Sequence, residues 1–489
     1  MTSAATVTGP SATDTAPATP NLTDPEVLGP RLENRLRAVL GGGASVRDLQ
    51  ILTGGASRLM WRVELDHPEH EKVVLRMHHP SDANPEDNER EARVLAAAHA
   101  EGVRSPAVLD FDSTSEVLGV PYVVLSWVDG ETIARKVLRD ERFGAARSAL
   151  ARDLGEAIAR IHHVDPQTLT DAGVRLPHLD DHTGKLRADL EASGIPRPAL
   201  RLALAELDRT APAEAPADTL VHGDFRMGNL MIDEAGLAAV LDWEITHTGN
   251  PHEDLGYVCM RAWRFGGPGR VAGVGDVEEF LTAYEAAGGV RPSAAALTWW
   301  EARATVWWGV GCLRQMQRSV PGHANELELL AIGRRTAEQE YDVLELLYPD
   351  VEAAEFGGVE FGAGSVSAAE AEAPTLFTNP TAGEFLAALE NYLDTDLVHG
   401  TGEPNRFKAR VAKNALGVLR REQEARAAAD AWFASALAGL GVGSEAELDA
   451  HVAGLADSSA QTPEVRELVA VLKRMARLRL EVSNPKYLR

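Results

Sequence analysis

The sequence predicts an α+β fold in two successive parts, followed by an all-helical region. Short apolar segments divided by turn residues predict strands between residues 49 and 127. From about residue 132 onward, apolar side chains recur at helical spacing. Residues 349–378 are rich in Gly, Ala and Glu and have no period, which is typical of a linker. A chain of 489 residues is too long for one ordinary core, so we expect roughly two or three domains.

The composition, 45% hydrophobic and 25% charged, is typical of a soluble globular protein. The net charge of −25 argues against nucleic acid or an anionic membrane as a partner. No apolar run is long enough to span a membrane, and the N-terminus lacks the pattern of a signal or transit peptide. We therefore expect a cytoplasmic protein. Its two cysteines, Cys259 and Cys312, have no metal or redox spacing and should be reduced and buried.

The first part begins with residues 1–27, whose Ala, Thr, Pro and Ser predict a disordered tail. Helices are expected over Arg31–Leu40, which ends at three glycines, and over Asn88–Ala100, which opens with acidic residues. Five strands are expected, at Leu49–Thr53, Met60–Leu65, Lys72–Met77, Pro106–Asp112 and Pro121–Trp127.

The second part is mostly helical. Its main helices are expected at Leu154–His163, Asp276–Ala287, Ser293–Gln317 and Glu326–Leu347. Within Ser293–Gln317, positions 300, 304, 307, 308 and 311 form one stripe, which usually indicates core packing. Trp299 and Arg303 lie beside that stripe, and contact with a substrate is the alternative to core packing for this pair.

The C-terminal region is expected to form a small helical bundle with its own core. Its helices are predicted at Thr381–Leu393, Asn405–Phe433, Glu445–Leu455 and Thr462–Leu480. Thr381 and Glu384 have the spacing of a capping box at the start of the first of these helices. A basic face near Arg410 is either a solvated helix surface or a contact with the acidic remainder of the chain.

The most informative stretch runs from Leu220 to Asp254. Two apolar runs, Leu230–Ile232 and Leu237–Leu241, predict a hairpin, with Gly236 able to take the positive φ that such turns favour. Polar residues bracket this hairpin, with His222, Asp224 and Asn229 before it and Asp242 after it. Because a hairpin brings its two ends together, Asp224, Asn229 and Asp242 should converge.

These side chains suit phosphoryl transfer. A carboxylate can take the proton of an attacking hydroxyl, and an amide oxygen with a second carboxylate can bind Mg²⁺ on phosphates. Such a reaction requires little beyond positioning and charge neutralisation. The alternative is that these residues only form a turn or a helix cap, because His-Gly-Asp is a common tripeptide and buried Asp–Asn pairs are frequent in turns. The complete pattern, with its internal hairpin, favours the functional interpretation.

The pattern His-Gly-Asp, four residues, Asn, a hairpin and Leu-Asp resembles the catalytic segment of the aminoglycoside phosphotransferase family. The resemblance implies a two-lobed protein-kinase-like fold, with an N-lobe at 28–125 and a C-lobe at 126–348. The helical bundle at 379–489 resembles a domain of unassigned function often joined to such kinases. The expected activity is Mg²⁺-dependent transfer of the γ-phosphoryl group of ATP or GTP to a small-molecule hydroxyl.

By this resemblance Asp224 is the catalytic base, and Asn229 and Asp242 are the Mg²⁺ ligands. His222 supports the loop, and Asp254 buttresses it from behind. The family usually has Gly-Asp-Pro where this chain has Gly-Asn-Pro, but this departure lies outside the expected metal ligands.

A glycine-rich turn with Gly54, Gly55 and Ser57 is expected to lie over the nucleotide phosphates, because backbone N–H groups in such a turn are free to donate. Most Gly-Gly pairs between strands are plain turns, and only the motifs that follow favour the functional interpretation.

Arg76 stands where the family usually has the phosphate-binding Lys, and its expected ion-pair partner is Glu91. Arginine can bind phosphate bidentately, so function is retained in this interpretation. Lys72 opens the same strand and is expected to be a solvated surface residue. Ser126 and Val128 resemble the hinge whose backbone meets the adenine edge, which leaves ATP versus GTP open.

Within the superfamily the chain resembles the branch associated with acyl-CoA dehydrogenases, through Val74-Leu75-Arg76, Glu89-Arg90-Glu91 and Trp243-Glu244. A hydroxyacyl thioester or similar metabolite is therefore the leading expected acceptor, and an aminoglycoside is the alternative. A further alternative is a non-catalytic nucleotide-binding scaffold whose bundle recruits a partner protein. Intact Asp224, Asn229 and Asp242 argue against the scaffold.

Overall fold

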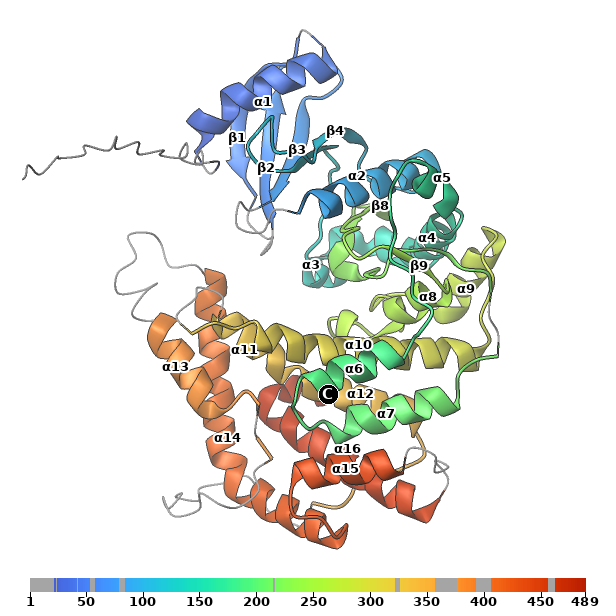
Figure 1. Cartoon of the computed structure of the whole chain (residues 1–489), viewed down its shortest axis with the longest axis vertical. Helices are drawn as coiled ribbons and strands as arrows, with labels where there is room; N and C mark the ends of the chain where they lie inside the picture. The colour runs from blue at the N-terminus through green and yellow to red at the C-terminus, as the bar shows by residue number, and fades with distance from the viewer. Residues whose placement is uncertain are drawn as a thin grey trace, which may run out of the picture. The chain divides into compact units, whose positions relative to one another are not determined.

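The structure is a computed structural model (Figure 1), and it divides into two compact units. One unit comprises residues up to 129 together with 169–175, and the other comprises the rest. The structure describes residues 22, 24–41, 43–52, 58–78, 84–213, 216–321, 326–356, 376–377, 379–392, 406–455 and 462–489, without the side chains of 390, 391 and 406–410. The expected disordered tail, apart from Leu22 and residues 24–27, and the expected glycine-rich turn lie outside these ranges, as do the side chains of the basic face near Arg410.

The first unit is an antiparallel five-stranded sheet in the order β1-β2-β3-β5-β4, with two helices. Trp61 and Val63 of β2 alternate with less buried residues, and so do Val73 and Leu75 of β3, as period two requires. The elements are α1 (Pro25–Leu40), β1 (Val46–Ile51), β2 (Arg58–Leu65), β3 (Lys72–His78), α2 (Pro85–Ala100), β4 (Val108–Asp112) and β5 (Tyr122–Ser126). The five predicted strands and both predicted helices are therefore present, with boundaries shifted by a few residues.

The second unit is mainly helical (Figure 1), and its described residues also form two short two-stranded antiparallel sheets. Its first half contains α3 (Ala134–Arg139), η2 (Glu141–Phe143), α4 (Gly144–His162), α5 (Pro166–Asp171), α6 (Gly184–Ala192), α7 (Pro198–Arg209), β6 (Thr219–Val221), η3 (Met227–Asn229), β7 (Leu230–Ile232), β8 (Leu237–Val240) and β9 (His247–Gly249). The residues of α5 are divided between the two units.

The remaining elements complete the second unit. They are α8 (His252–Cys259), η4 (Arg261–Trp263), α9 (Val277–Ala286), α10 (Ala294–Gln317), α11 (Glu326–Arg334), α12 (Thr336–Leu347), α13 (Ala382–Tyr392), α14 (Arg406–Gly439), α15 (Glu445–Gly454), α16 (Pro463–Ser483) and η6 (Pro485–Leu488). The predicted capping box opens α13, where Glu384 N–H donates to Thr381 Oγ1 at 3.2 Å and the Glu384 carboxylate accepts from Thr381 N–H.

One predicted helix, Glu326–Leu347, is two helices that break at Arg335. The Arg335 N–H donates to Ile332 O, three residues back, and the Thr336 hydroxyl donates to Gly333 O at 2.9 Å. Threonine can satisfy a backbone carbonyl with its side chain and so compete with the regular helical ladder. The apolar spacing continues across the break, which is why periodicity alone predicted one helix.

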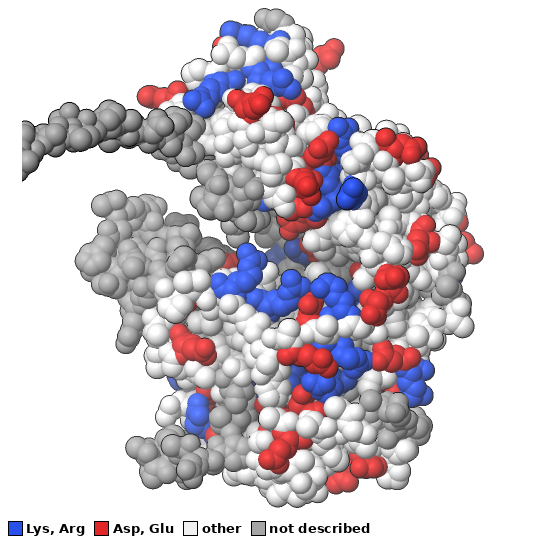
Figure 2. Space-filling model, viewed as in Figure 1, with Lys and Arg blue, Asp and Glu red and all other residues white. Residues whose placement is uncertain are grey.

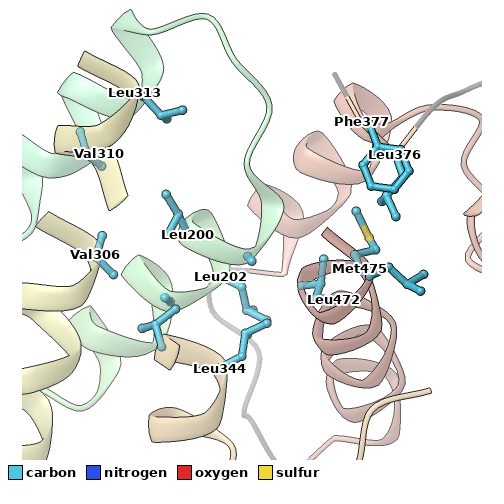
Figure 3. Packing of buried hydrophobic residues seen from close by; sticks show 14 of the residues in the cluster. Leu200, Leu202, Val306, Val310, Leu313, Leu344, Leu376, Phe377, Leu472 and Met475 are labelled. Carbon is cyan, nitrogen blue, oxygen red and sulfur yellow. The ribbon is translucent and has the colours of Figure 1, made fainter. Parts of the chain in front are cut away.

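The C-terminal helices share one hydrophobic core with the preceding helices, whereas we expected a bundle with its own core. Figure 3 shows Leu200 and Leu202 of α7, Leu344 of α12 and Leu472 and Met475 of α16 within this single cluster. The buried Arg479 of α16 also pairs with Glu340 of α12 at 3.3 Å. The C-terminal region therefore completes the core of the helical unit.

Two other predictions from composition concern the cysteines and membrane spans. Cys259 and Cys312 are both buried and free, and burial raises the pKa of Cys259 to about 12, which keeps it a neutral thiol. Within the ranges that the structure describes, no helix combines the length and apolarity needed to cross a bilayer.

Candidate active site

The hairpin forms where the sequence predicts it, and it brings Asn229 next to the segment that carries Asp242. Strands β7 and β8 pair with Leu230 opposite Val240, and the Leu241 N–H donates to Asn229 O at 2.8 Å. Asp242, which follows directly, has a φ of 65°, a left-handed conformation that Asp tolerates better than most residues. The backbone therefore turns at Asp242, the expected metal ligand, two residues after β8 ends at Val240.

The hairpin turn itself differs from the prediction, because Gly236 is not among the glycines with positive φ. Asp233 Oδ1 accepts hydrogen bonds from the Ala235 and Gly236 N–H groups at 2.7 and 2.9 Å and closes the turn. A Cβ at Gly236 would lie 2.2 Å from Asp153 Oδ2, which accepts from Leu237 N–H at 3.1 Å. A side chain here would displace the Asp153 carboxylate of α4 from its hydrogen bond to Leu237.

Asp224 accepts hydrogen bonds from three side chains. Arg226 Nε donates to its Oδ1 at 2.9 Å, and the Tyr257 hydroxyl donates to the same oxygen at 2.7 Å. Asn229 Nδ2 donates to Oδ2 at 2.6 Å. Burial and the charge of Asp224 raise the pKa of Tyr257 well above 10, so the phenol stays a donor. The predicted convergence of Asp224 and Asn229 is present, and the carboxylate is held in one orientation.

His222 is fully buried and has a defined tautomer. The Asp224 N–H donates to Nδ1 at 3.2 Å, so Nε2 carries the proton and donates to Leu241 O at 3.1 Å. Burial lowers the pKa of His222, despite the carboxylates of Asp254 and Asp224 nearby, which keeps the ring neutral. His222 therefore ties the loop after β6 to the end of β8, which agrees with the supporting position expected for it.

Asp254 fixes the same loop from α8. Its Oδ2 accepts from His222 N–H at 2.8 Å, and its Oδ1 accepts from Gly223 N–H at 2.9 Å. His162 of α4 lies 3.2 Å from Oδ2 and contacts the Tyr284 hydroxyl through its other nitrogen. Burial alone would raise the pKa of Asp254, but His162, His222 and the backbone donors lower it overall. The carboxylate is therefore a charged anchor behind the loop, as expected.

The donor set suits a magnesium ion that also contacts phosphates. Because Asn229 Nδ2 donates to Asp224, its amide oxygen is the atom left for a cation, and Asp242 adds a carboxylate. Among the described residues, no group of three or more His, Cys, Asp and Glu side chains is placed to hold a metal. Two hard oxygen ligands completed by phosphates and water are typical of magnesium sites in phosphoryl-transfer enzymes.

A cavity of about 430 Å³ adjoins Asp224 and Asp242. It is lined by Leu186, Asp189, Asp224, Arg226, Asp242, Glu244, Ile245, Tyr257, Trp263, Trp307, Trp308, Val310, Gly311, Arg314, Gln315 and Arg318. Trp263 and Trp308 lie 5.1 Å apart between ring centroids, and Arg226 lies over Trp263 at 4.7 Å. The aromatic rings form one wall, and carboxylates and arginines form much of the remaining lining, so the cavity can bind a polar small molecule.

The tryptophans of α10 are arranged differently from the prediction. Trp307 and Trp308 were expected in the core, but they are half-buried and line the cavity. Trp299 instead is buried and donates to Leu207 O at 2.9 Å, and Arg303 pairs with Glu253 at 2.8 Å. Neither Trp299 nor Arg303 is among the cavity residues. Periodicity could not separate a core stripe from a cavity wall.

Three residues at the site were missed by sequence reasoning: Arg226, Tyr257 and Trp263. Arg226 lies two residues after Asp224, and Tyr257 lies one helical turn after Asp254 in α8. The sequence shows those spacings, but it does not indicate that the side chains of Arg226 and Tyr257 both donate to the Asp224 carboxylate.

In the first unit, Arg76 of β3 forms an ion pair with Glu91 of α2, as expected. Lys72, at the start of β3, lies 6.0 Å from the Trp127 ring centroid. Ser126 pairs with Val73 at the end of β5, and its hydroxyl accepts from Ala107 N–H. Val128 is half-buried just beyond that strand, whereas Gly54, Gly55 and Ser57 lie outside the described residues.

Because Glu91 holds Arg76, we expect Arg76→Ala to raise the KM for nucleotide by about 10- to 100-fold, the effect of losing a charged hydrogen bond. Lys72→Ala removes a cation from the same strand and serves as the matched control. Steady-state kinetics with varied ATP distinguishes them, and greater sensitivity at Lys72 would mean that the phosphate contact is misassigned.

Two regions of the chain match known protein families. Residues 48–300 match a phosphotransferase enzyme family, and residues 400–487 match a domain family of unknown function. The chain is 32% identical over 182 residues to acyl-CoA dehydrogenase family member 10 of Mus musculus, covering 35% of this chain and 16% of the relative. It is 33% identical over 189 residues to family member 11 of Gallus gallus, covering 37% of this chain and 24% of the relative.

The chain therefore spans less than a quarter of each of these curated relatives. Among solved structures, a candidate aminoglycoside phosphotransferase from Ralstonia eutropha matches with a TM-score of 0.53 and 24% identity, over 65% of this chain and 98% of that chain. This likeness confirms the kinase-like fold predicted from the sequence. Because residues 48–300 are more than half of the 489, the chain belongs to the phosphotransferase enzyme family.

Proposed function

We propose that this phosphotransferase moves the γ-phosphoryl group of ATP to a hydroxyl of an acyl thioester metabolite, with Asp224 as general base. The observation that carries the proposal is the orientation of Asp224. Its carboxylate is held by Arg226, Tyr257 and Asn229 beside a cavity large enough for part of a small molecule. A base for a substrate hydroxyl requires this combination of a fixed carboxylate and an adjoining space.

In the proposed step the acceptor hydroxyl oxygen bonds to the γ-phosphorus, and the bond from that phosphorus to the β–γ bridging oxygen breaks. The hydroxyl proton passes to the Asp224 carboxylate, and ADP leaves. Asn229 and Asp242 would hold Mg²⁺, which neutralises charge on the phosphates when bound. Arg76, kept in position by Glu91, would contact the phosphates, and the backbone at Ser126 and Val128 would contact the base.

Asp242→Ala should weaken nucleotide binding only when Mg²⁺ is present, by roughly tenfold or more, because the variant lacks a carboxylate ligand. Isothermal titration of ATP with and without Mg²⁺ measures this. Glu234→Ala, at an exposed acidic position in the hairpin turn, is the control. An equal loss with and without Mg²⁺ would point to misfolding and contradict the assignment of Asp242 as a ligand.

The acceptor class rests on two lines of support. The matched relatives are named acyl-CoA dehydrogenases, which suggests a thioester substrate for this chain as well. The cavity also offers donors for such a molecule. Arg314 and Arg318 are exposed at the cavity and can donate to the phosphates or carbonyl groups of such a molecule.

Figure 2 shows basic side chains gathered where α6 and α10 lie. Lys185 of α6 and Arg314 of α10 belong to these helices, and both pair with Asp189. Arg314 and Arg318 would contact the phosphates of an anionic acceptor such as a CoA ester, with Asp189 balancing part of the charge of Arg314. The cavity lining holds Asp189, Asp224, Asp242 and Glu244 beside Arg226, Arg314 and Arg318, so its charge alone does not separate an anionic acceptor from a polycationic aminoglycoside.

A panel of acyl-CoA esters tests the acceptor. Each hydroxyacyl-CoA is compared with the acyl-CoA of the same acyl length that lacks the hydroxyl group. Mass spectrometry detects the product as the phosphorylated acyl-CoA. We expect product only from hydroxylated members. Phosphorylation of an aminoglycoside, with none of the hydroxyacyl-CoA series, would replace the proposed acceptor but leave the reaction type intact.

A further inference from the structure

The last residues of the chain contact the helices behind the cavity wall. We propose that Asn484 and Tyr487, here called the C-terminal clamp, position Trp263 and Trp308 and so set the affinity for the acceptor. The clamp lies just beyond α16 and includes the final residue of the match to a domain of unknown function. The proposal rests on the proposed function only in treating this cavity as the acceptor site.

Tyr487 binds the turn that carries Trp263. Its hydroxyl donates to Asp342 of α12, and its carbonyl oxygen accepts from Arg261 Nη2 at 2.5 Å. The Arg261 guanidinium also lies 4.6 Å from the Tyr487 ring centroid and donates to Asp342 Oδ1 at 3.3 Å. Because Arg261 begins the short η4 turn that ends at Trp263, these contacts fix where that turn presents its tryptophan.

Asn484 reaches the same wall by a second route. Its Nδ2 donates to Glu338 Oε1 at 3.0 Å, and Glu338 Oε2 accepts from Arg335 Nε at 3.0 Å. The Arg335 guanidinium lies 5.8 Å from the ring centroids of both Trp263 and Trp308. A cation held at this distance attracts the aromatic faces and restrains both rings.

The contacts of Tyr487 and those of Asn484 therefore both lead to Trp263. Trp263 is connected to Asp224 through Arg226. Arg226 also lies over the Trp263 ring, 4.7 Å from its centroid, and Arg226 pairs with Asp224. Asn484 and Tyr487 are positioning residues, since neither lines the cavity. Loss of the clamp should loosen the aromatic wall and raise the acceptor KM, while the phosphate contacts proposed at Arg76 stay unchanged.

The clamp can be removed without opening the hydrophobic core. Val482 is the last residue of the core cluster, and α16 ends at Ser483. A chain ending at Ser483 should therefore keep its fold. Tyr487→Phe loses the hydroxyl donor to Asp342 but keeps the ring over Arg261, whereas Tyr487→Ala loses the ring as well. Lys486→Ala changes an exposed side chain in the same η6 turn and is the matched control.

Two measurements on the full chain and its variants test the clamp. Hydrogen exchange of residues 257–265 requires no acceptor, and we expect faster exchange in the Ser483 truncation and in Tyr487→Ala. With the hydroxyacyl-CoA found in the panel, Tyr487→Phe should raise the acceptor KM about three- to tenfold, as expected for one lost hydrogen bond, with the ATP KM unchanged. Tyr487→Ala and the truncation lose further contacts and should raise the acceptor KM more. Tyr487→Phe should fall between wild type and Tyr487→Ala.

Two outcomes would overturn the proposal. The first is exchange in residues 257–265 that matches wild type in both Tyr487→Ala and the truncation. The second is an ATP KM that rises as much as the acceptor KM, because a general loss of folding would move both. If no acceptor is phosphorylated, the hydrogen-exchange result still shows whether the clamp restrains residues 257–265. Failure of the clamp proposal can therefore be distinguished from failure of the proposed function.

Discussion

Asp224→Asn is expected to reduce kcat by about 10²–10⁴-fold, the usual effect of removing a general base. The variant side chain has nearly the same shape, so the loop held by His222 and Asp254 should keep its position. Mg²⁺-dependent nucleotide binding should also persist, because Asn229 and Asp242 remain. Product formation from ATP and a hydroxyacyl-CoA measures the first effect, and isothermal titration measures the second.

The control for this variant is Glu234→Gln, which makes the same change of charge at an exposed position in the hairpin turn. It should have wild-type turnover. Near-normal turnover in Asp224→Asn would show that another group takes the proton. Loss of nucleotide binding together with turnover would indicate that the loop had collapsed and that Asp224 is a structural residue.

A chain ending at Asp350 is expected to lose its native fold. The truncation removes α16, whose Leu472 and Met475 pack in one core with Leu344 of α12 (Figure 3). Exposing each large buried side chain costs roughly 1.5–3 kcal/mol, and a domain has a total stability of only about 5–15 kcal/mol. The truncation also leaves Glu340 without Arg479. We expect an aggregated or molten product.

Near-UV circular dichroism and thermal melting of the two truncations measure this effect. The chain ending at Ser483, which keeps α16, should melt cooperatively, whereas the chain ending at Asp350 should not. A soluble, cooperatively melting protein that ends at Asp350 would show that residues 349–378 do mark a domain boundary, as their composition predicts.

The local geometry of the candidate site could be predicted because its residues are close along the chain. His222, Asp224, Asn229 and Asp242 flank one hairpin, which two short apolar runs and the turn residues between them predict. Arg76 and Glu91 were also paired correctly, with support from the resemblance to a known family. Such local patterns are determined by backbone geometry and turn chemistry, which a single sequence records.

What the sequence did not predict depends on contacts between distant segments. Gly236 leaves room for the Asp153 carboxylate of α4, and the position of Trp308 at a cavity depends on Trp263 of a different element. The shared core of the C-terminal helices is a further example. An amphipathic helix shows that it has an apolar face, but it does not show which helix covers that face.

The central claim, phosphoryl transfer to a hydroxyl beside Asp224, is tested most directly by following the γ-phosphate. Wild-type protein is incubated with Mg²⁺, ATP labelled at the γ-phosphate and each hydroxyacyl-CoA, and the products are separated. The proposed function predicts label on the acceptor oxygen in wild type and about 10²–10⁴-fold less in Asp224→Asn. Label released only as inorganic phosphate, or transferred equally by Asp224→Asn, would contradict it.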